Sequence, residues 1–130
     1  MKEKKIVIVE DESGLSDSLE QKFTTQGAWV TVINNGDDAA RAVEQLHPDL
    51  VVLDLMLPGT TGEFVLQEIR QIDCCGTVPV LVLTNFTDVA SIQQQAAESD
   101  ILEYMVKANS SLSDITKQVE TMLNDSTTTS

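Results

Sequence analysis

Basic residues are scarce in this chain. Its 130 residues include 8 Lys and Arg against 21 Asp and Glu, which gives a formal net charge of -13. The one basic run is short and lies at the N-terminus, at residues 2–5. Proteins that bind nucleic acid or an anionic membrane surface meet the phosphate groups with clusters of Lys and Arg. We therefore expect neither nucleic acid nor a membrane as a direct partner.

Long apolar runs and cysteines are also few. No apolar stretch approaches the roughly 18 residues of a membrane-spanning helix, and the charged N-terminus lacks the apolar core of a signal peptide. We therefore expect a cytoplasmic protein. The only two cysteines, Cys74 and Cys75, are adjacent. Neighbouring cysteines rarely form a structural disulfide and lack the spacing of metal ligands, so we expect free thiols.

The length of the chain allows one domain and excludes two full ones. The last residues, 124–130, are Asn, Asp, Ser and Thr only, so they cannot bury an apolar core. We expect a single domain over residues 1–124, followed by a disordered tail or the stub of a linker over residues 125–130.

Two periodicities alternate along residues 4–124. Short apolar runs predict five strands, at residues 6–9, 29–33, 50–53, 80–83 and 101–106. Apolar residues spaced three or four apart predict five helices, near residues 15–23, 39–46, 65–72, 87–97 and 112–122. Five β-then-α units with continuous apolar strands indicate an α/β fold with a parallel sheet between helices. Trp29, at the start of the second strand, is expected to be a packing residue.

Polar residues follow four of the five predicted strands. They are Glu10, Asp11 and Glu12 after the first strand, Asp54 after the third, Thr84 after the fourth and Lys107 after the fifth. Each one alone is more commonly a helix cap or a surface charge. In open parallel sheets, however, ligands bind outside the carboxyl ends of the strands, where the strand order reverses. Four matching strand ends therefore indicate one shared site.

The residue types at this rim favour phosphoryl transfer. Gathered carboxylates raise each other's pKa unless a cation lies among them, and a set of oxygen ligands suits Mg²⁺ better than zinc. A nearby lysine and threonine supply a positive charge and a hydroxyl donor for an anionic group. A metal, an ammonium and a hydroxyl around one carboxylate are what the transfer of a phosphoryl group to that carboxylate requires.

The chain resembles bacterial response-regulator receiver domains over residues 4–124. The resemblance lies in four separated motifs: IVIVEDE at 6–12, LDLMLPGTTG at 53–62, VLT at 82–84 and YMVK at 104–107. It implies a flavodoxin-like, doubly wound sheet of five parallel strands in the order 2-1-3-4-5, with five helices. It also implies a signalling module of a two-component system, or a phosphorelay, that catalyses its own phosphorylation and slow dephosphorylation and is not a metabolic enzyme.

The resemblance further assigns roles to individual residues. It makes Asp54 the phosphoacceptor and a ligand of Mg²⁺, which Asp11 would bind directly and Glu10 through water. The backbone carbonyl of Met56 would complete the protein ligands.

Three further residues would respond to the phosphoryl group. Lys107 would contact it, Thr84 would donate a hydrogen bond to it, and Tyr104 would be the aromatic switch residue. By the same resemblance, the phosphodonor is a sensor histidine kinase, a phosphotransfer protein or a small molecule. The output is a downstream protein partner or a missing output domain, and the chain is a monomer or a phosphorylation-dependent dimer.

The chain also departs from the usual pattern of the family. Glu10 replaces the commoner Asp, Asn85 stands where Ala or Gly usually follows the threonine, and Ala108 stands where a proline usually follows the lysine. Residues 97–100 replace a usual Gly-Ala before the last strand.

Other functions of such a fold remain as alternatives. The domain could be a phosphate sink or relay without direct output, or a receiver that binds without phosphorylation. A flavin-binding electron carrier is disfavoured because the acidic residues after the first strand would repel the flavin phosphate. An aspartate-nucleophile phosphatase would usually carry a second Asp at position 56, where this chain has Met.

Overall fold

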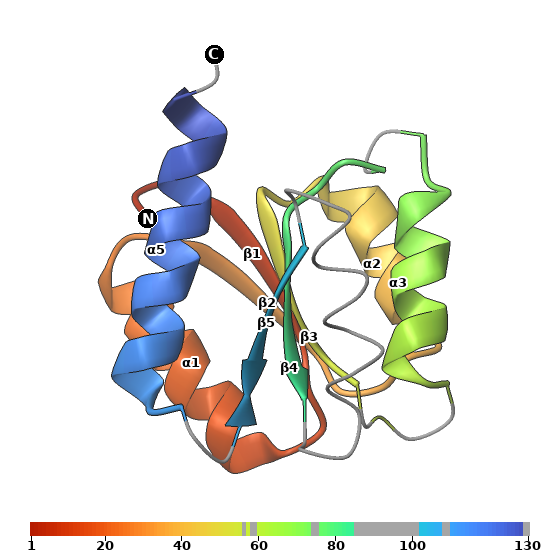
Figure 1. Cartoon of the computed structure of the whole chain (residues 1–130), viewed down its shortest axis with the longest axis horizontal. Coiled ribbons are helices and arrows are strands. Elements are labelled where there is room, and N and C mark those ends of the chain that lie inside the picture. The colour runs from red at the N-terminus through yellow and green to blue at the C-terminus, as the bar shows by residue number, and fades with distance from the viewer. Residues whose placement is uncertain (56, 58–59, 74–75, 85–101, 108–109, 129–130) are drawn as a thin grey trace.

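The computed structural model describes residues 1–55, 57, 60–73, 76–84, 102–107 and 110–128 (Figure 1). In chain order its elements are β1 (Lys5–Val9), α1 (Ser13–Thr25), β2 (Trp29–Ile33), α2 (Ala39–Leu46), β3 (Leu50–Asp54), α3 (Gly62–Arg70), β4 (Val80–Thr84), β5 (Leu102–Val106) and α5 (Leu112–Thr128). The predicted helix at residues 87–97 lies outside the described residues. Helix α5 continues past the predicted apolar stripe, and the division of the chain at residue 124 stays a prediction. None of the described helices is both long and apolar enough to cross a membrane.

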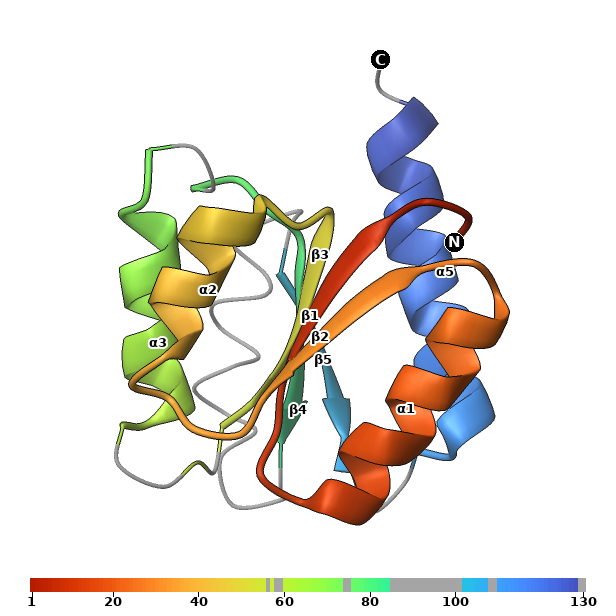
Figure 2. The same ribbon diagram turned by 180° about the vertical axis from the view of Figure 1, so that it is seen from behind.

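All five strands run parallel in one sheet, in the order β2-β1-β3-β4-β5. Figures 1 and 2 show α1 and α5 over one face of the sheet and α2 and α3 over the other. Because helices cover both faces, the interior strands β1, β3 and β4 can be apolar at nearly every position. The predicted doubly wound, flavodoxin-like topology is confirmed.

Alternate residues of the strands build two separate apolar cores. Val7 and Val9 of β1 pack with Ala39 and Val43 of α2 on one face, which we call the α2/α3 face. The intervening residues of β1 pack on the opposite face, against Phe23 and other side chains of α1 and α5. All of the residues named here are at most 1% exposed. The two cores hold the strands in register and thereby bring their carboxyl ends to one rim.

Trp29 does not pack in either core. Its side chain is 68% exposed. It begins the edge strand β2 and pairs in register with Lys5, so it lies on the α2/α3 face of the sheet. Helix α2 packs over β1, one strand further in, and leaves this end of β2 uncovered. The prediction that Trp29 serves packing within the domain is therefore wrong.

The ends of two helices follow the rules of helix capping. Gly27, just after α1, has a φ of 95°, a conformation that favours glycine. Ahead of α5, the hydroxyl of Ser111 accepts a 3.1 Å hydrogen bond from the backbone N–H of Asp114. The Asp114 carboxylate in turn accepts one of 3.0 Å from the N–H of Ser111. Hydrogen bonds from the backbone and the side chain of Ser111 to this carboxylate lower the pKa of Asp114.

Candidate functional site

The strand order brings the carboxyl ends of β1 and β3 side by side. Val9 pairs with Leu53, so Glu10, the next residue along, reaches the rim beside Asp54, the last residue of β3. Strand β4 lies on the other side of β3, and β5 follows it at the edge. Lys107 directly follows β5 and returns toward the two carboxylates. Side chains from the ends of three strands, β1, β3 and β5, thus meet at one point, as the sequence predicts.

Three carboxylates form a tight cluster there. Glu10, Asp11 and Asp54 each offer an oxygen, and these oxygens all lie within 4.8 Å of one another. Glu10 and Asp54 are only 1% and 2% exposed, whereas Asp11 is exposed to solvent. Oε2 of Glu10 is buried, and its contact with the described residues is an ion pair with Lys107, whose Nζ lies 3.1 Å away. A hard divalent cation with oxygen ligands, such as Mg²⁺, suits this donor set.

Lys107 is the counter-ion of this cluster. Its Nζ lies 3.1 Å from Oδ2 of Asp54 and 3.1 Å from Oε2 of Glu10, and it donates a hydrogen bond of 3.3 Å to Oε1 of Glu10. Glu12 approaches the same ammonium from the solvent side, at 3.8 Å. The single positive charge therefore bridges the ends of β1, β3 and β5 where the carboxylates would otherwise repel one another.

The pKa values of the two bridged groups reflect this crowding. Burial, reinforced by the hydrogen bond and the charge of Asp54, raises the pKa of Glu10 to about 7. Burial by itself would lower the pKa of Lys107, but its hydrogen bonds and charge interactions with Glu10 and Asp54 outweigh burial and hold that pKa above the ordinary value. Lys107 therefore stays protonated, whereas Glu10 titrates near neutral pH.

The metal-free domain is expected to lose stability between pH 4.5 and pH 7. Glu10 has a pKa of about 7 in the folded chain against 4.5 for a free glutamate, so between these values the folded state binds a proton on Glu10 more tightly than the unfolded state does. The stability that this proton adds is lost as the pH rises toward 7. The free energy of unfolding should fall by at most about 3 kcal/mol and then level off. Urea denaturation in EDTA at several pH values measures this free energy, and Glu10→Gln should remove most of its dependence on pH. An unchanged profile in Glu10→Gln would contradict the assignment.

The loop after β3 is held by contacts that the sequence did not reveal. The N–H of Gly62 donates a 3.1 Å hydrogen bond to the carbonyl of Leu55. The hydroxyl of Thr60 donates one to Asp37, which belongs to the loop after β2. The contact of Glu12 with Lys107 was also not predicted from the sequence. Its only signal there is that Glu12 is the third acidic residue in the run after β1. A polar pair in two separate loops, such as Asp37 and Thr60, carries no such signal.

Several predicted site residues are described only in part. Thr84 ends β4 at the expected rim, but its side chain lies outside the described part of the structure. Met56, Asn85 and Ala108 are outside it altogether. Tyr104 of β5 is half-buried and packs against the apolar core of the α2/α3 face. The roles predicted for these residues stay predictions.

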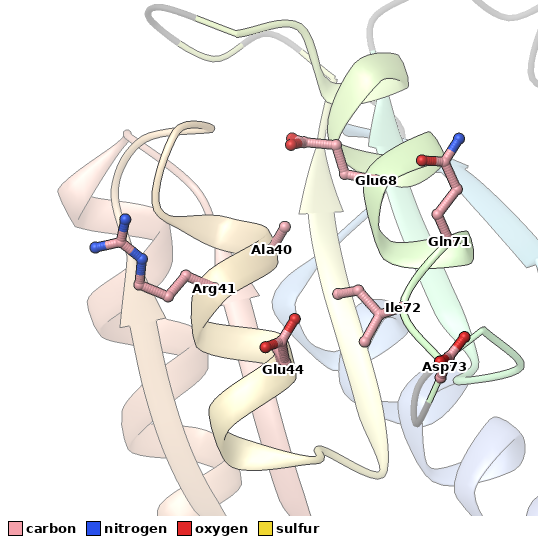
Figure 3. A pocket seen from close by; sticks show the side chains of 7 residues that line it. All are labelled: Ala40, Arg41, Glu44, Glu68, Gln71, Ile72 and Asp73. Carbon is pink, nitrogen blue, oxygen red and sulfur yellow. The ribbon is translucent and has the colours of Figure 1, made fainter.

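A separate hollow of about 610 Å³ lies between α2 and α3 (Figure 3). Its lining residues are Ala40, Arg41, Glu44, Glu68, Gln71, Ile72 and Asp73. None of them belongs to the acidic cluster at the rim. This hollow offers no buried, unpaired polar group among its described lining residues, so the chemistry stays at the ends of the strands.

Comparison with known sequences agrees with the geometry. The family model described as "Response regulator receiver domain" matches residues 6–120. The chain is 33% identical over 102 residues to the transcriptional regulatory protein AfsQ1 of Streptomyces coelicolor, which covers 78% of this chain and 44% of that protein. It is 36% identical over 103 residues to the DNA-binding response regulator MtrA of Mycolicibacterium paratuberculosis; the match covers 79% of this chain and 44% of that protein. The chain thus spans less than half the length of these relatives.

Solved structures show the same fold. A putative response regulator from Chloroflexus aurantiacus aligns with a TM-score of 0.80 at 25% identity, over 95% of this chain and 99% of that one. A CheY-like receiver domain protein from Methanospirillum hungatei aligns with a TM-score of 0.84 at 19% identity, over 99% and 100%. The receiver domain of the sensor histidine kinase PA1611 of Pseudomonas aeruginosa, solved with a magnesium ion in its active-site cleft, aligns with a TM-score of 0.79 at 21% identity, over 94% and 98%.

The names of the relatives bear on the partner predictions. MtrA is a DNA-binding regulator, so the prediction that excludes nucleic acid as a partner finds no support in this comparison. A receiver is a signalling module and not a classical enzyme, which agrees with the sequence prediction. The match covers 6–120, nearly the whole domain, and the described acidic residues and lysine meet at the rim where the motifs predict them. The chain therefore belongs to the response regulator receiver domain family of two-component signal transduction.

Proposed function

We propose that this domain accepts a phosphoryl group on Asp54 in a Mg²⁺-dependent reaction and then switches a protein-binding surface. The observation that carries the proposal is the contact of one lysine ammonium with two buried carboxylates, 3.1 Å from each, inside a cluster of three carboxylates. Three carboxylates carry more negative charge than one lysine ammonium neutralises, so the cluster can bind a further cation. The same acidic cluster disfavours the electron-carrier alternative because it would repel a flavin phosphate.

The residues of the cluster divide the chemistry between them. An oxygen of the Asp54 carboxylate attacks the phosphorus of the donor, and the bond from phosphorus to the leaving group breaks with its electron pair going to the leaving group. Asp11, Glu10 and the Met56 carbonyl would hold Mg²⁺ together with Asp54. The ion, when bound, would neutralise negative charge on the phosphoryl oxygens. Lys107 would turn its ammonium from the carboxylates to one of those oxygens.

The switch would follow from the new oxygens on Asp54. Thr84 ends the neighbouring strand β4 and would donate its hydroxyl to one of them. Tyr104 lies on the adjacent strand β5, in register with Val82 and half-buried against the core, where a change of packing would reach the surface. A histidine kinase or phosphotransfer protein would be the physiological donor. The downstream partner would read the surface formed by residues 87–97, β5 and α5.

Phosphorylation of Asp54 is directly testable. Incubation with acetyl phosphate and Mg²⁺ should add one phosphoryl group by intact-mass measurement, and peptide fragmentation should place it on Asp54. EDTA should prevent the addition because the cluster then lacks its cation, and Asp54→Asn should abolish it because the amide is not a nucleophile. Asp49→Asn, at the opposite end of β3, is the matched control and should be labelled like the wild type. Undiminished labelling of Asp54→Asn would refute the proposal.

A further inference from the structure

The edge strand β2 has no strand beside it on its outer side in the part of the chain that the structure describes. Along β2 the N–H of Trp29 donates to the carbonyl of Lys4 at 2.8 Å, and the carbonyl of Ile33 accepts from the N–H of Glu10 at 3.0 Å. In a strand, alternate residues bond to the same side, so every second residue of β2 faces β1. Val30 and Val32 therefore turn their N–H and C=O groups to the open edge of the sheet.

This edge lacks the residues that normally keep an edge strand from pairing with another strand. The strand reads Trp-Val-Thr-Val-Ile, without a charge, a proline or a glycine. Natural edge strands are usually blunted by such residues, because an open edge pairs readily with another strand. The other edge strand, β5, carries the exposed Glu103 in its middle part. An uncharged strand rich in β-branched residues is thus exposed on one side of the domain only.

An apolar surface accompanies the open edge. Trp29 and Phe64 are the two large hydrophobic side chains that are exposed in the described part of the structure, and Trp29 is the more exposed, at 68%. A recess of about 180 Å³ lies beside the ring, lined by Lys5, Ile6, Val7, Trp29, Val30, Thr31 and Leu46. Burial of this exposed indole against another chain is favourable because it removes a large apolar area from water.

The two ends of β2 carry opposite charges. Three lysines and one acidic residue, Glu3, lie at its start, which makes this end basic overall: the N–H of Trp29 bonds to the carbonyl of Lys4, the N–H of Glu3 bonds to Gly27, and the backbone of Lys2 lies next to Gly27. Residues 37–38, both Asp, follow its end. A second strand placed antiparallel to β2 with the same charges would set its acidic end against this basic end, and its basic end against this acidic one. A second copy of this chain has that arrangement.

We infer that two copies of the chain pair through β2, antiparallel, about a two-fold axis at Thr31. Val30 would then exchange backbone hydrogen bonds with Val32 of the second copy, and the two sheets would become one. Opposite residues of antiparallel strands lie on the same face. Trp29 would therefore pack on Ile33 of the second copy, and the two copies of Thr31 would face each other at about 5 Å. This pairing is independent of the proposed function because it lies on an edge of the sheet away from Asp54.

The association is measured without metal or phosphodonor, which separates it from any phosphorylation-dependent contact. Sedimentation in EDTA, at about 0.15 M salt to screen the net charge, should show a dimer that forms as the concentration rises to about 1 mM. The emission of Trp29, the only tryptophan, should shift to shorter wavelength over the same range, because its ring leaves water. A chain that stays monomeric throughout overturns the inference.

Charge substitutions on the axis identify the interface. Thr31→Lys and Thr31→Asp should each be monomeric, because like charges would meet across the axis, whereas an equal mixture of the two should dimerise. Thr121→Lys, the same substitution on an exposed site of α5, should dimerise like the wild type. If the Thr31 variants lose their native circular dichroism, Trp29→Glu at the 68% exposed site replaces them and should weaken the dimer. A dimer that these variants leave intact overturns the inference.

Discussion

Lys107→Met is expected to destabilise the metal-free domain by about 2–4 kcal/mol at pH 8. The ammonium lies 3.1 Å from both Glu10 and Asp54, and its removal leaves two buried carboxylates with no cation between them. Partial exposure of the lysine side chain, at 20%, keeps the expected loss below that of a fully buried pair. Urea denaturation in EDTA, monitored by circular dichroism, measures the difference from the wild type.

The loss in Lys107→Met should depend on pH and on metal. At pH 5.5 Glu10, with its pKa of about 7, is mostly protonated, so fewer negative charges remain unpaired and the loss should be smaller. Millimolar Mg²⁺ should restore part of the lost stability at pH 8, because a divalent cation replaces the missing charge. The control is Lys117→Met, on an exposed site of α5, where a change within about 0.5 kcal/mol is expected. Equal effects of the two substitutions would contradict the bridging role of Lys107.

Gly62→Ala is expected to cost about 2–4 kcal/mol and to lower the melting temperature by roughly 10 °C. A Cβ at position 62 would lie 2.5 Å from Cα of Leu55 and 2.6 Å from the carbonyl oxygen of Asp54. Both are backbone atoms, so the chain itself would have to move. The displaced backbone carries the Asp54 carboxylate, and phosphorylation should slow as well.

Gly14→Ala is the matched control for that substitution. No atom lies within 4 Å of a Cβ built at position 14, which is in the first turn of α1. Alanine is also the better helix former, so we expect a change between zero and about 1 kcal/mol of added stability. Melting curves of the two variants decide the matter, and a Gly62→Ala variant as stable as Gly14→Ala would show that the turn after β3 tolerates a side chain.

The sheet was predictable because its interior strands are buried on both faces. Short runs of β-branched and other apolar residues such as Val51-Val52-Leu53 are typical of strands buried on both faces, and the polar residue that follows such a run lies at the rim by topology. The edge strand β2 shows where this reasoning stops. Trp29 is apolar and begins a good strand, but the sequence does not say which helix covers which strand. Among the described helices, α1 packs on the opposite face of β2, and none covers Trp29 on the α2/α3 face.

The sequence predicted which residues form the site better than it predicted how buried each of them is. Glu10 and Asp11 are neighbours of similar chemistry, and nothing in their spacing tells which one is buried. The structure buries Glu10 and exposes Asp11 because consecutive residues after β1 point in different directions. The pKa of Glu10 depends on that burial, so it could not be predicted. The contact between Thr60 and Asp37 depends on two loops meeting across the fold, which is equally invisible in sequence.

The position of Lys107 inside the acidic cluster also bears on which ions can compete for the site. The ammonium is tethered to β5, so its local concentration is high and does not fall on dilution. A monovalent ion such as K⁺ brings no more charge than the ammonium that it would displace, and it gains little by entering. A divalent ion brings twice that charge. We therefore expect the lysine to disfavour binding of abundant monovalent ions at the carboxylates more than binding of divalent ions.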